Sequence, residues 1–202
     1  MKNIPVILIN GFLAPKQANL PLKCFLSSKG FNVHLLDLPF LNLADIKTIA
    51  LKISEGIDSI LEIQGAKQCN LIGVSLGGIS GLYYLKNLDG NKKTKNFIAF
   101  GTPLKGTWKA LLLSPFVGLI SKSLWQTLPN NSLLKEIIKD PIKGTKFYSI
   151  YAKNDPIAPP DSACLDWSEN IEVKTLPFPI SHQGLIFSKN AMESIVEILA
   201  RD

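Results

Sequence analysis

The chain has 202 residues, enough for one domain with a large buried core, and its 46% hydrophobic content argues against a disordered protein. Its net charge of +6 comes almost entirely from lysine, since Arg201 is the only arginine. Sequence-specific nucleic-acid binding usually relies on arginine, so no nucleic-acid partner is expected. No apolar run reaches the roughly 20 residues of a membrane-spanning helix.

The spacing of the cysteines and the first residues of the sequence indicate the cellular compartment in which the protein is expected. Cys24, Cys69 and Cys164 lie far apart in the sequence and lack the spacing of metal ligands or of a disulfide framework. The apolar run near the start is interrupted by Pro5 and is followed by no small-residue cleavage site. We therefore expect reduced thiols and a cytoplasmic protein.

Short apolar runs alternate with helical patterns along the chain. This alternation predicts an α/β fold with a mostly parallel sheet of about six strands, covered by helices on both faces. The expected strands are 6–9, 31–36, 70–72, 96–100, 146–151 and 172–176, and the expected helices are 17–28, 44–64, 79–85 and 189–199.

The connection between the fourth and fifth strands is far longer than an ordinary αβ linkage. Within a single domain spanning 1–202, we expect a helical insertion at about 104–143, with two short amphipathic helices divided by Pro115 and Gly118. The leucine-rich, aromatic first part of this insertion contains lysines but no acidic residue. It could add to the core, or it could form a lid that contacts an acyl chain or, transiently, a membrane surface.

The motif with the most chemical content is Gly73-Val74-Ser75-Leu76-Gly77. An apolar strand precedes it and a helical pattern follows it, which is the context of a nucleophile elbow, where a sharp turn holds the serine hydroxyl clear of the sheet. The pattern alone is weak, because a serine capping a small-residue helix looks the same. The interpretation depends on whether other strand ends supply a base and an acid.

A serine hydroxyl needs a base to accept its proton, and only two histidines exist. His34 lies inside an expected strand, whereas His182 follows the last strand and is the expected base. Asp155 directly follows another strand and is the expected acid that orients His182, with Asp161 and Asp166 as competitors in the same loop. The order Ser75, Asp155, His182 is typical of a nucleophile elbow followed by two later strand-end loops.

An oxyanion that develops during acyl transfer needs two fixed donors. The backbone N–H of Leu76 at the helix start is one candidate, and the N–H of Phe12 in the loop after the first strand is the other. Leu13 in the same loop and Leu104 at the start of the insertion are the expected substrate-binding residues.

These residues resemble the α/β-hydrolase superfamily, and within it the bacterial triacylglycerol lipases and esterases. The similar segments are Asn10-Gly11-Phe12 at the oxyanion turn, residues 73–78 at the elbow, 101–107 before the insertion and 125–134 after it. Asn10 stands where that family has a histidine. The short chain, with no evident calcium-ligand cluster, is more similar to a small intracellular esterase than to a secreted lipase.

The resemblance implies a serine hydrolase that cleaves carboxylic esters of medium or long acyl chains through an acyl-serine intermediate. It implies a small-molecule ester or lipid as substrate, and neither a cofactor nor a metal. Two alternatives use the same fold: an acyltransferase with the same three residues, and a non-catalytic binding protein.

Overall fold

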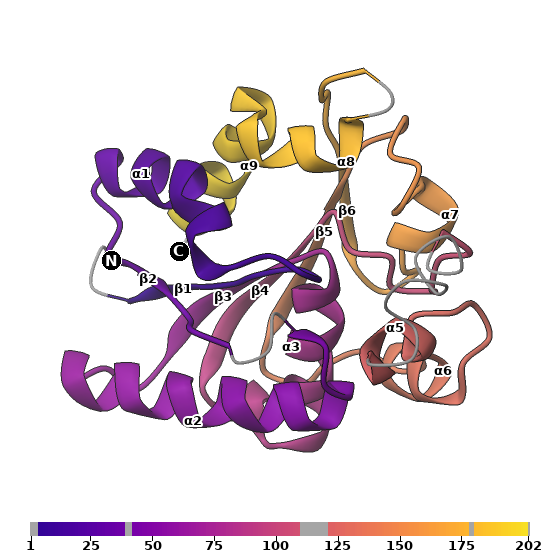
Figure 1. Ribbon diagram of the computed structural model, residues 1–202. Helices are drawn as coiled ribbons and strands as arrows, with labels where there is room; N and C mark the ends of the chain where they lie inside the picture. Colours follow the sequence, from indigo (N-terminus) through magenta and orange to yellow (C-terminus); the bar gives the residue numbers. More distant parts are fainter. Residues whose placement is uncertain (1–3, 39–41, 110–120, 178–179, 202) are drawn as a thin grey trace.

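Six parallel strands form one sheet in the order β2-β1-β3-β4-β5-β6 (Figure 1). The computed structural model describes residues 4–38, 42–109, 121–177 and 180–201. The strands are β1 (Val6–Ile9), β2 (Val33–Leu35), β3 (Cys69–Val74), β4 (Thr94–Phe100), β5 (Lys146–Tyr151) and β6 (Glu169–Glu172). The predicted parallel sheet of six strands is confirmed.

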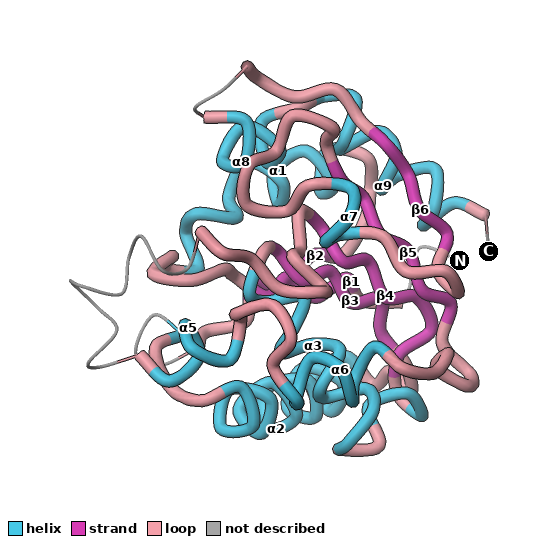
Figure 2. Tube along the Cα trace, turned by 90° about the vertical axis from the view of Figure 1, so that its right-hand side faces the viewer, coloured by secondary structure: helices cyan, strands magenta, loops and turns pink. Residues whose placement is uncertain are grey.

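Helices cover both faces of the sheet (Figure 2). One layer contains α1 and α9, and the other contains α2, α3 and α6. The helices and 3-10 turns are η1 (Lys16–Asn19), α1 (Leu20–Ser28), α2 (Ile46–Gln64), α3 (Leu76–Asn87), η3 (Gly90–Lys92), α5 (Lys122–Gln126), α6 (Ser132–Ile138), α7 (Pro160–Ala163), α8 (Ser181–Gly184), η4 (Leu185–Phe187) and α9 (Lys189–Ala200).

The continuous apolar run of β1 follows from burial on both faces. Side chains alternate along a strand, so Ile7 and Ile9 pack toward α2 and α3, whereas Val6 and Leu8 pack toward α1 and α9. The apolar stripe of α2 is likewise buried, and Asp45 caps this helix by accepting a 3.0 Å hydrogen bond from the Thr48 N–H.

The strand registers bring four chain segments to one edge of the sheet. Ile9 pairs with Gly73, Val74 with Phe100, and Phe100 with Ile150. The loops that follow β1, β3, β4 and β5 therefore leave the sheet side by side at its carboxyl edge, where ligands bind in open α/β sheets.

The predicted bounds of the last strand, 172–176, are wrong: β6 is Glu169–Glu172, so it begins three residues earlier and ends four residues earlier. β6 pairs with β5 at the edge of the sheet, and its side chains are mostly exposed and polar. An exposed edge strand does not need alternating apolar residues. The prediction was therefore placed on the apolar and β-branched residues that come just after β6 in the sequence. The predicted helix 17–28 is in fact divided into η1 and α1 at Asn19.

In the described part of the long connection between β4 and β5 lie the helices α5 and α6. The expected division at Pro115 and Gly118 lies outside the described residues, and a lid role for this insertion stays a prediction. No helix in the described ranges is long and apolar enough to span a membrane.

Close packing of α3 against β3 depends on glycine. A Cβ added to Gly73 would lie 2.5 Å from the Cα of Gly78 and 2.6 Å from the carbonyl oxygen of Gly77. These obstacles are backbone atoms, so a side chain at Gly73 would push the helix away from the strand.

We therefore expect Gly73→Ala to lower the free energy of unfolding by at least about 3 kcal/mol, at the upper end of overpacking penalties. Gly65→Ala is the control: Gly65 has a φ of 59° but nothing within 4 Å of an added Cβ, so only the left-handed backbone cost of about 1 kcal/mol applies. Urea unfolding measures both. A Gly73→Ala loss no larger than the Gly65→Ala loss would contradict this packing argument.

Candidate active site

Ser75 occupies the sharp turn between β3 and α3, with φ 52° and ψ −122°. This region is strained for a residue with a Cβ, and such strain persists only where the surroundings fix the backbone. Here the Ser75 N–H donates to the Phe100 carbonyl at 2.9 Å, and the Ser75 carbonyl accepts from the Gly78 N–H at 2.9 Å. Both bonds hold the turn that presents the hydroxyl at the carboxyl edge.

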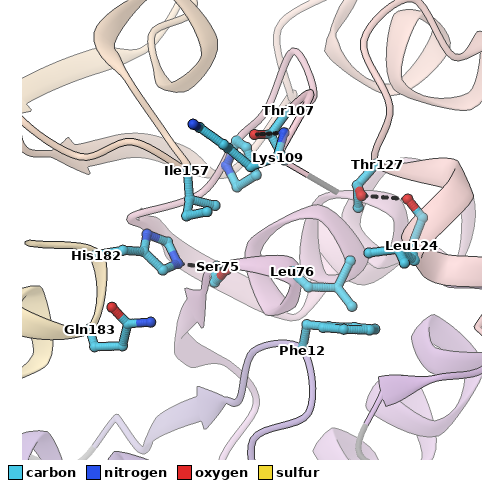
Figure 3. Close-up of a pocket in the computed structure, with 11 residues that line it drawn as sticks. Phe12, Ser75, Leu76, Thr107, Lys109, Leu124, Thr127, Ile157, His182 and Gln183 are labelled. Carbon is cyan, nitrogen blue, oxygen red and sulfur yellow. Dashed lines mark hydrogen bonds between the residues drawn. The ribbon is translucent and has the colours of Figure 1, made fainter. Parts of the chain in front are cut away.

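The structure brings Ser75, His182 and Asp155 into one hydrogen-bonded chain. The Nε2 of His182 lies 3.1 Å from the Oγ of Ser75 (Figure 3). Its Nδ1 lies 2.7 Å from the Oδ2 of Asp155. Nδ1 donates to the carboxylate, which leaves Nε2 as the acceptor that faces the serine. His182 lies in the short helix α8, not in an open loop as the sequence suggested.

Backbone donors hold the Asp155 carboxylate in place. Asp155 is 2% exposed, and its Oδ1 accepts from the N–H groups of Ile157 at 2.8 Å and Ala158 at 3.1 Å. These bonds compensate for burial of the charge and leave Oδ2 aimed at His182. A further bond, from the Ser181 hydroxyl to the Asn154 carbonyl at 2.9 Å, joins the two loops that carry the acid and the base.

This arrangement can activate a serine for attack on an electrophilic carbon. Neutral His182 can take the Ser75 proton, and the buried carboxylate favours the imidazolium that forms. Gly101, just after β4, has a φ of 58°, which favours glycine, and an added Cβ would lie 2.8 Å from Leu185 Cδ1. The His182 ring and Asp155 Oδ2 would be at ordinary contact distances of 3.7 and 3.8 Å from it.

Two backbone N–H groups near Ser75 are available as donors. Leu76 is the first residue of α3, where a helix leaves its N–H without an intrahelical partner. The Phe12 N–H has no hydrogen-bond partner among the residues that the structure describes. Phe12, Leu76 and Ser75 line the same cavity, with His182 on the opposite side of the serine in the view of Figure 3.

Two cavities meet at Ser75 and His182. The first has a volume of about 190 Å³ and extends toward α5, where Leu124 and Thr127 line it. The second has a volume of about 330 Å³ and extends toward η1 and η4, with Ala18 and Ile186 among its lining residues. The surface that each cavity offers is mainly apolar, so the two cavities suit apolar groups on either side of a reacting carbon.

Other sequence candidates lie away from the site. Leu13 is 40% exposed and Leu104 is only 1% exposed in the core, and neither lines the two cavities, so their roles in substrate binding stay predictions. Asp161 and Asp166 are exposed and make no contact with His182. His34 lies in the edge strand β2, where burial lowers its pKa.

Several cavity-lining residues were missed from the sequence. Ile157 and Gln183 could have been found, because each lies within two residues of Asp155 or His182. Thr107, Leu124 and Thr127 come from the long connection, for which a lid in contact with an acyl chain was one expectation, but no local pattern distinguishes these three residues.

Within the described ranges, no group of three or more His, Cys, Asp or Glu side chains is arranged to hold a metal ion. The three cysteines are free thiols there, and burial raises the pKa of Cys69 to about 12, which makes this thiol a poor nucleophile. Cys24 is exposed.

The fold and the site together define a parallel α/β protein with a serine directly after β3, an aspartate in the loop after β5 and a histidine in the segment after β6. No family model matches the chain. Three solved structures are similar over 98% of this chain. The mature form of a Bacillus licheniformis lipase has a TM-score of 0.79 and 14% sequence identity, with 91% of that chain covered. Aspergillus fumigatus lipase B has a TM-score of 0.78 and 22% identity, with 53% of that chain covered. An α/β hydrolase from a lagoon-sediment metagenome has a TM-score of 0.67 and 18% identity, with 89% of that chain covered. The chain therefore has the α/β-hydrolase fold.

We expect a fluorophosphonate to label Ser75, and Asp155→Asn to slow labelling at least about 10³-fold, because an amide favours the wrong His182 tautomer. Ser75→Ala should abolish labelling. The control is Asp161→Asn, which changes an exposed carboxylate in the same loop and should label like the wild type. Intact-mass kinetics measure all four proteins, and equal rates for the two aspartate variants would refute the assignment of Asp155.

Proposed function

We propose that this protein is a serine hydrolase that cleaves carboxylic esters of medium or long acyl chains. The observation that carries the proposal is the continuous hydrogen-bonded chain from Ser75 through His182 to the buried Asp155. Beside it lie the Phe12 and Leu76 N–H groups, which have no hydrogen-bond partner among the described residues. Two of the solved structures with a similar fold are named as lipases. Their names describe those proteins only, but the similar fold supports the same class of reaction for this chain.

In the proposed reaction, Ser75 Oγ attacks the ester carbonyl carbon while His182 Nε2 takes the hydroxyl proton. The carbonyl oxygen becomes an oxyanion that accepts hydrogen bonds from the Phe12 and Leu76 N–H groups. Collapse breaks the bond to the alkoxy group, which leaves as an alcohol with the proton from His182. A water molecule then gives a proton to His182 and attacks the acyl-serine carbonyl carbon. Cleavage of the bond to Ser75 Oγ releases the carboxylic acid, and His182 returns the proton to Oγ, which restores both residues.

The two cavities support a substrate with two apolar arms. An ester bound at Ser75 directs its acyl group and its alcohol group in different directions, and each cavity offers mainly apolar surface to one of them. We assign the acyl chain to the second, larger cavity, which η1 and η4 border, and the alcohol to the cavity beside α5.

Hydrolysis of p-nitrophenyl esters from acetate to palmitate tests the reaction. We expect turnover by the wild type, and a loss of at least about 10⁴-fold in kcat for Ser75→Ala and for His182→Ala, because either change removes the activated nucleophile. His34→Ala is the control and should keep wild-type turnover. Absence of wild-type turnover on every ester would reject the hydrolase and leave acyl transfer to another acceptor as the reaction to test.

A substitution that fills one cavity tests the assignment of the acyl chain. Ala18→Phe places a ring at the second cavity, so we expect kcat/KM for decanoate to fall at least about tenfold relative to butyrate, since a hydrophobic pocket discriminates by this order per lost methylene contact. The control is Thr107→Phe, which changes the first cavity and should leave the ratio unchanged. The reverse result would exchange the two assignments.

A further inference from the structure

Asn42 holds the turn that carries Phe12. Its side-chain amide nitrogen donates two hydrogen bonds, to the carbonyl oxygen of Asn10 at 2.7 Å and to that of Gly11 at 2.9 Å. Asn42 is fully buried, so water does not compete for these bonds. Both protons of the Asn42 amide group therefore form hydrogen bonds with two successive carbonyl oxygens of the turn after β1.

Because of peptide geometry, the hydrogen bond from Asn42 to the Gly11 carbonyl also sets the direction of the Phe12 N–H. The Gly11 carbonyl and the Phe12 N–H belong to the same planar trans peptide, so they point in opposite directions. Holding the carbonyl on Asn42 therefore directs the Phe12 N–H away from Asn42. The turn also lies against the nucleophile, because a Cβ added to Gly11 would be 3.1 Å from the Cβ of Ser75.

Asn42 is itself fixed by α5. Its backbone has a φ of 63°, a left-handed conformation that asparagine tolerates, and its carbonyl accepts from the Ser123 hydroxyl at 2.7 Å. The Lys122 N–H donates to the next carbonyl, that of Leu43, at 3.1 Å. A third bond joins the Ile46 N–H to the Gln126 side chain at 2.7 Å, so α5 holds the segment that carries Asn42.

We infer that Asn42 is a positioning residue for the oxyanion donor: it sets the direction of the Phe12 N–H through the Gly11–Phe12 peptide. The hydroxyl of Ser123 on α5 fixes Asn42 in turn by donating a hydrogen bond to its backbone carbonyl. This inference rests on the proposed ester hydrolysis, and it assigns to the long connection between β4 and β5 an influence on the rate of the chemical step.

Asn42→Asp tests the inference with little change in size. The carboxylate tolerates the same positive φ, but it has no donor for the two carbonyl oxygens. Removal of an oxyanion donor costs about 10²–10³ in kcat, and a donor that is misdirected should cost less, so we expect kcat to fall about 10–100-fold with KM within about twofold. Ki for an alkylboronic acid, whose serine adduct has the tetrahedral geometry, should rise by a similar factor.

The control is Asn96→Asp, near the amino end of β4, whereas Ser75 lies at the carboxyl edge of the sheet. Asn96 is also buried and its amide nitrogen donates to Asn70 at 2.9 Å, so the same change tests a buried amide that is remote from the site. We expect lower stability but unchanged kcat and boronic-acid Ki. Should Asn42→Asp fail to fold, Asn42→Gly keeps the positive φ and removes the same donors.

The outcomes separate the two proposals. If the wild type hydrolyses esters but the folded Asn42 variant matches the Asn96 control in kcat and in Ki, the positioning role is rejected and ester hydrolysis stands. If the wild type hydrolyses no ester, both proposals fall. A rise in KM alone, at constant kcat and constant boronic-acid Ki, would also reject the inference, because it would place Asn42 in ground-state binding.

Discussion

The close approach of α3 to β3 is the constraint on which the site depends. Glycine at positions 73 and 77 lets the helix start pack against the ends of β3 and β1, where an added Cβ would meet backbone atoms. The chain can then turn within one residue, and Ser75 takes up the strained torsion angles that this turn imposes. The cost of that strain is offset by packing on both sides of the turn, and its result is a hydroxyl held clear of the sheet and a helix N-terminus beside it.

Parallel strand order turns this local feature into a site. Because β1, β3, β4 and β5 are neighbours in register, their carboxyl ends deliver the Phe12 turn, Ser75, Gly101 and the Asp155 loop to one edge. The acid is then fixed by two N–H donors of its own loop and stays aimed at His182. For the proposed reaction, little of this geometry would have to form on substrate binding, which is the condition for electrostatic preorganisation.

The connection between β4 and β5 contacts the site in two places through its helix α5. Its helix α5 lines the smaller cavity through Leu124 and, through Ser123, bonds to the segment that holds the turn after β1. One five-residue helix thus contacts both the space beside the serine and the support of a backbone donor. Whatever displaces α5 acts on both.

The sequence determined much of this protein. Apolar runs located five of the six strands, because buried parallel strands must be apolar on both faces, and the glycine spacing around Ser75 identified the turn because only glycine fits there. The sequence also named Asp155 and His182, since the residues after parallel strands share one edge. Tertiary structure alone decided the rest. The edge strand β6 has no apolar signal, and Asn42 and Leu124 reach the site through contacts across long stretches of chain, which no local pattern records.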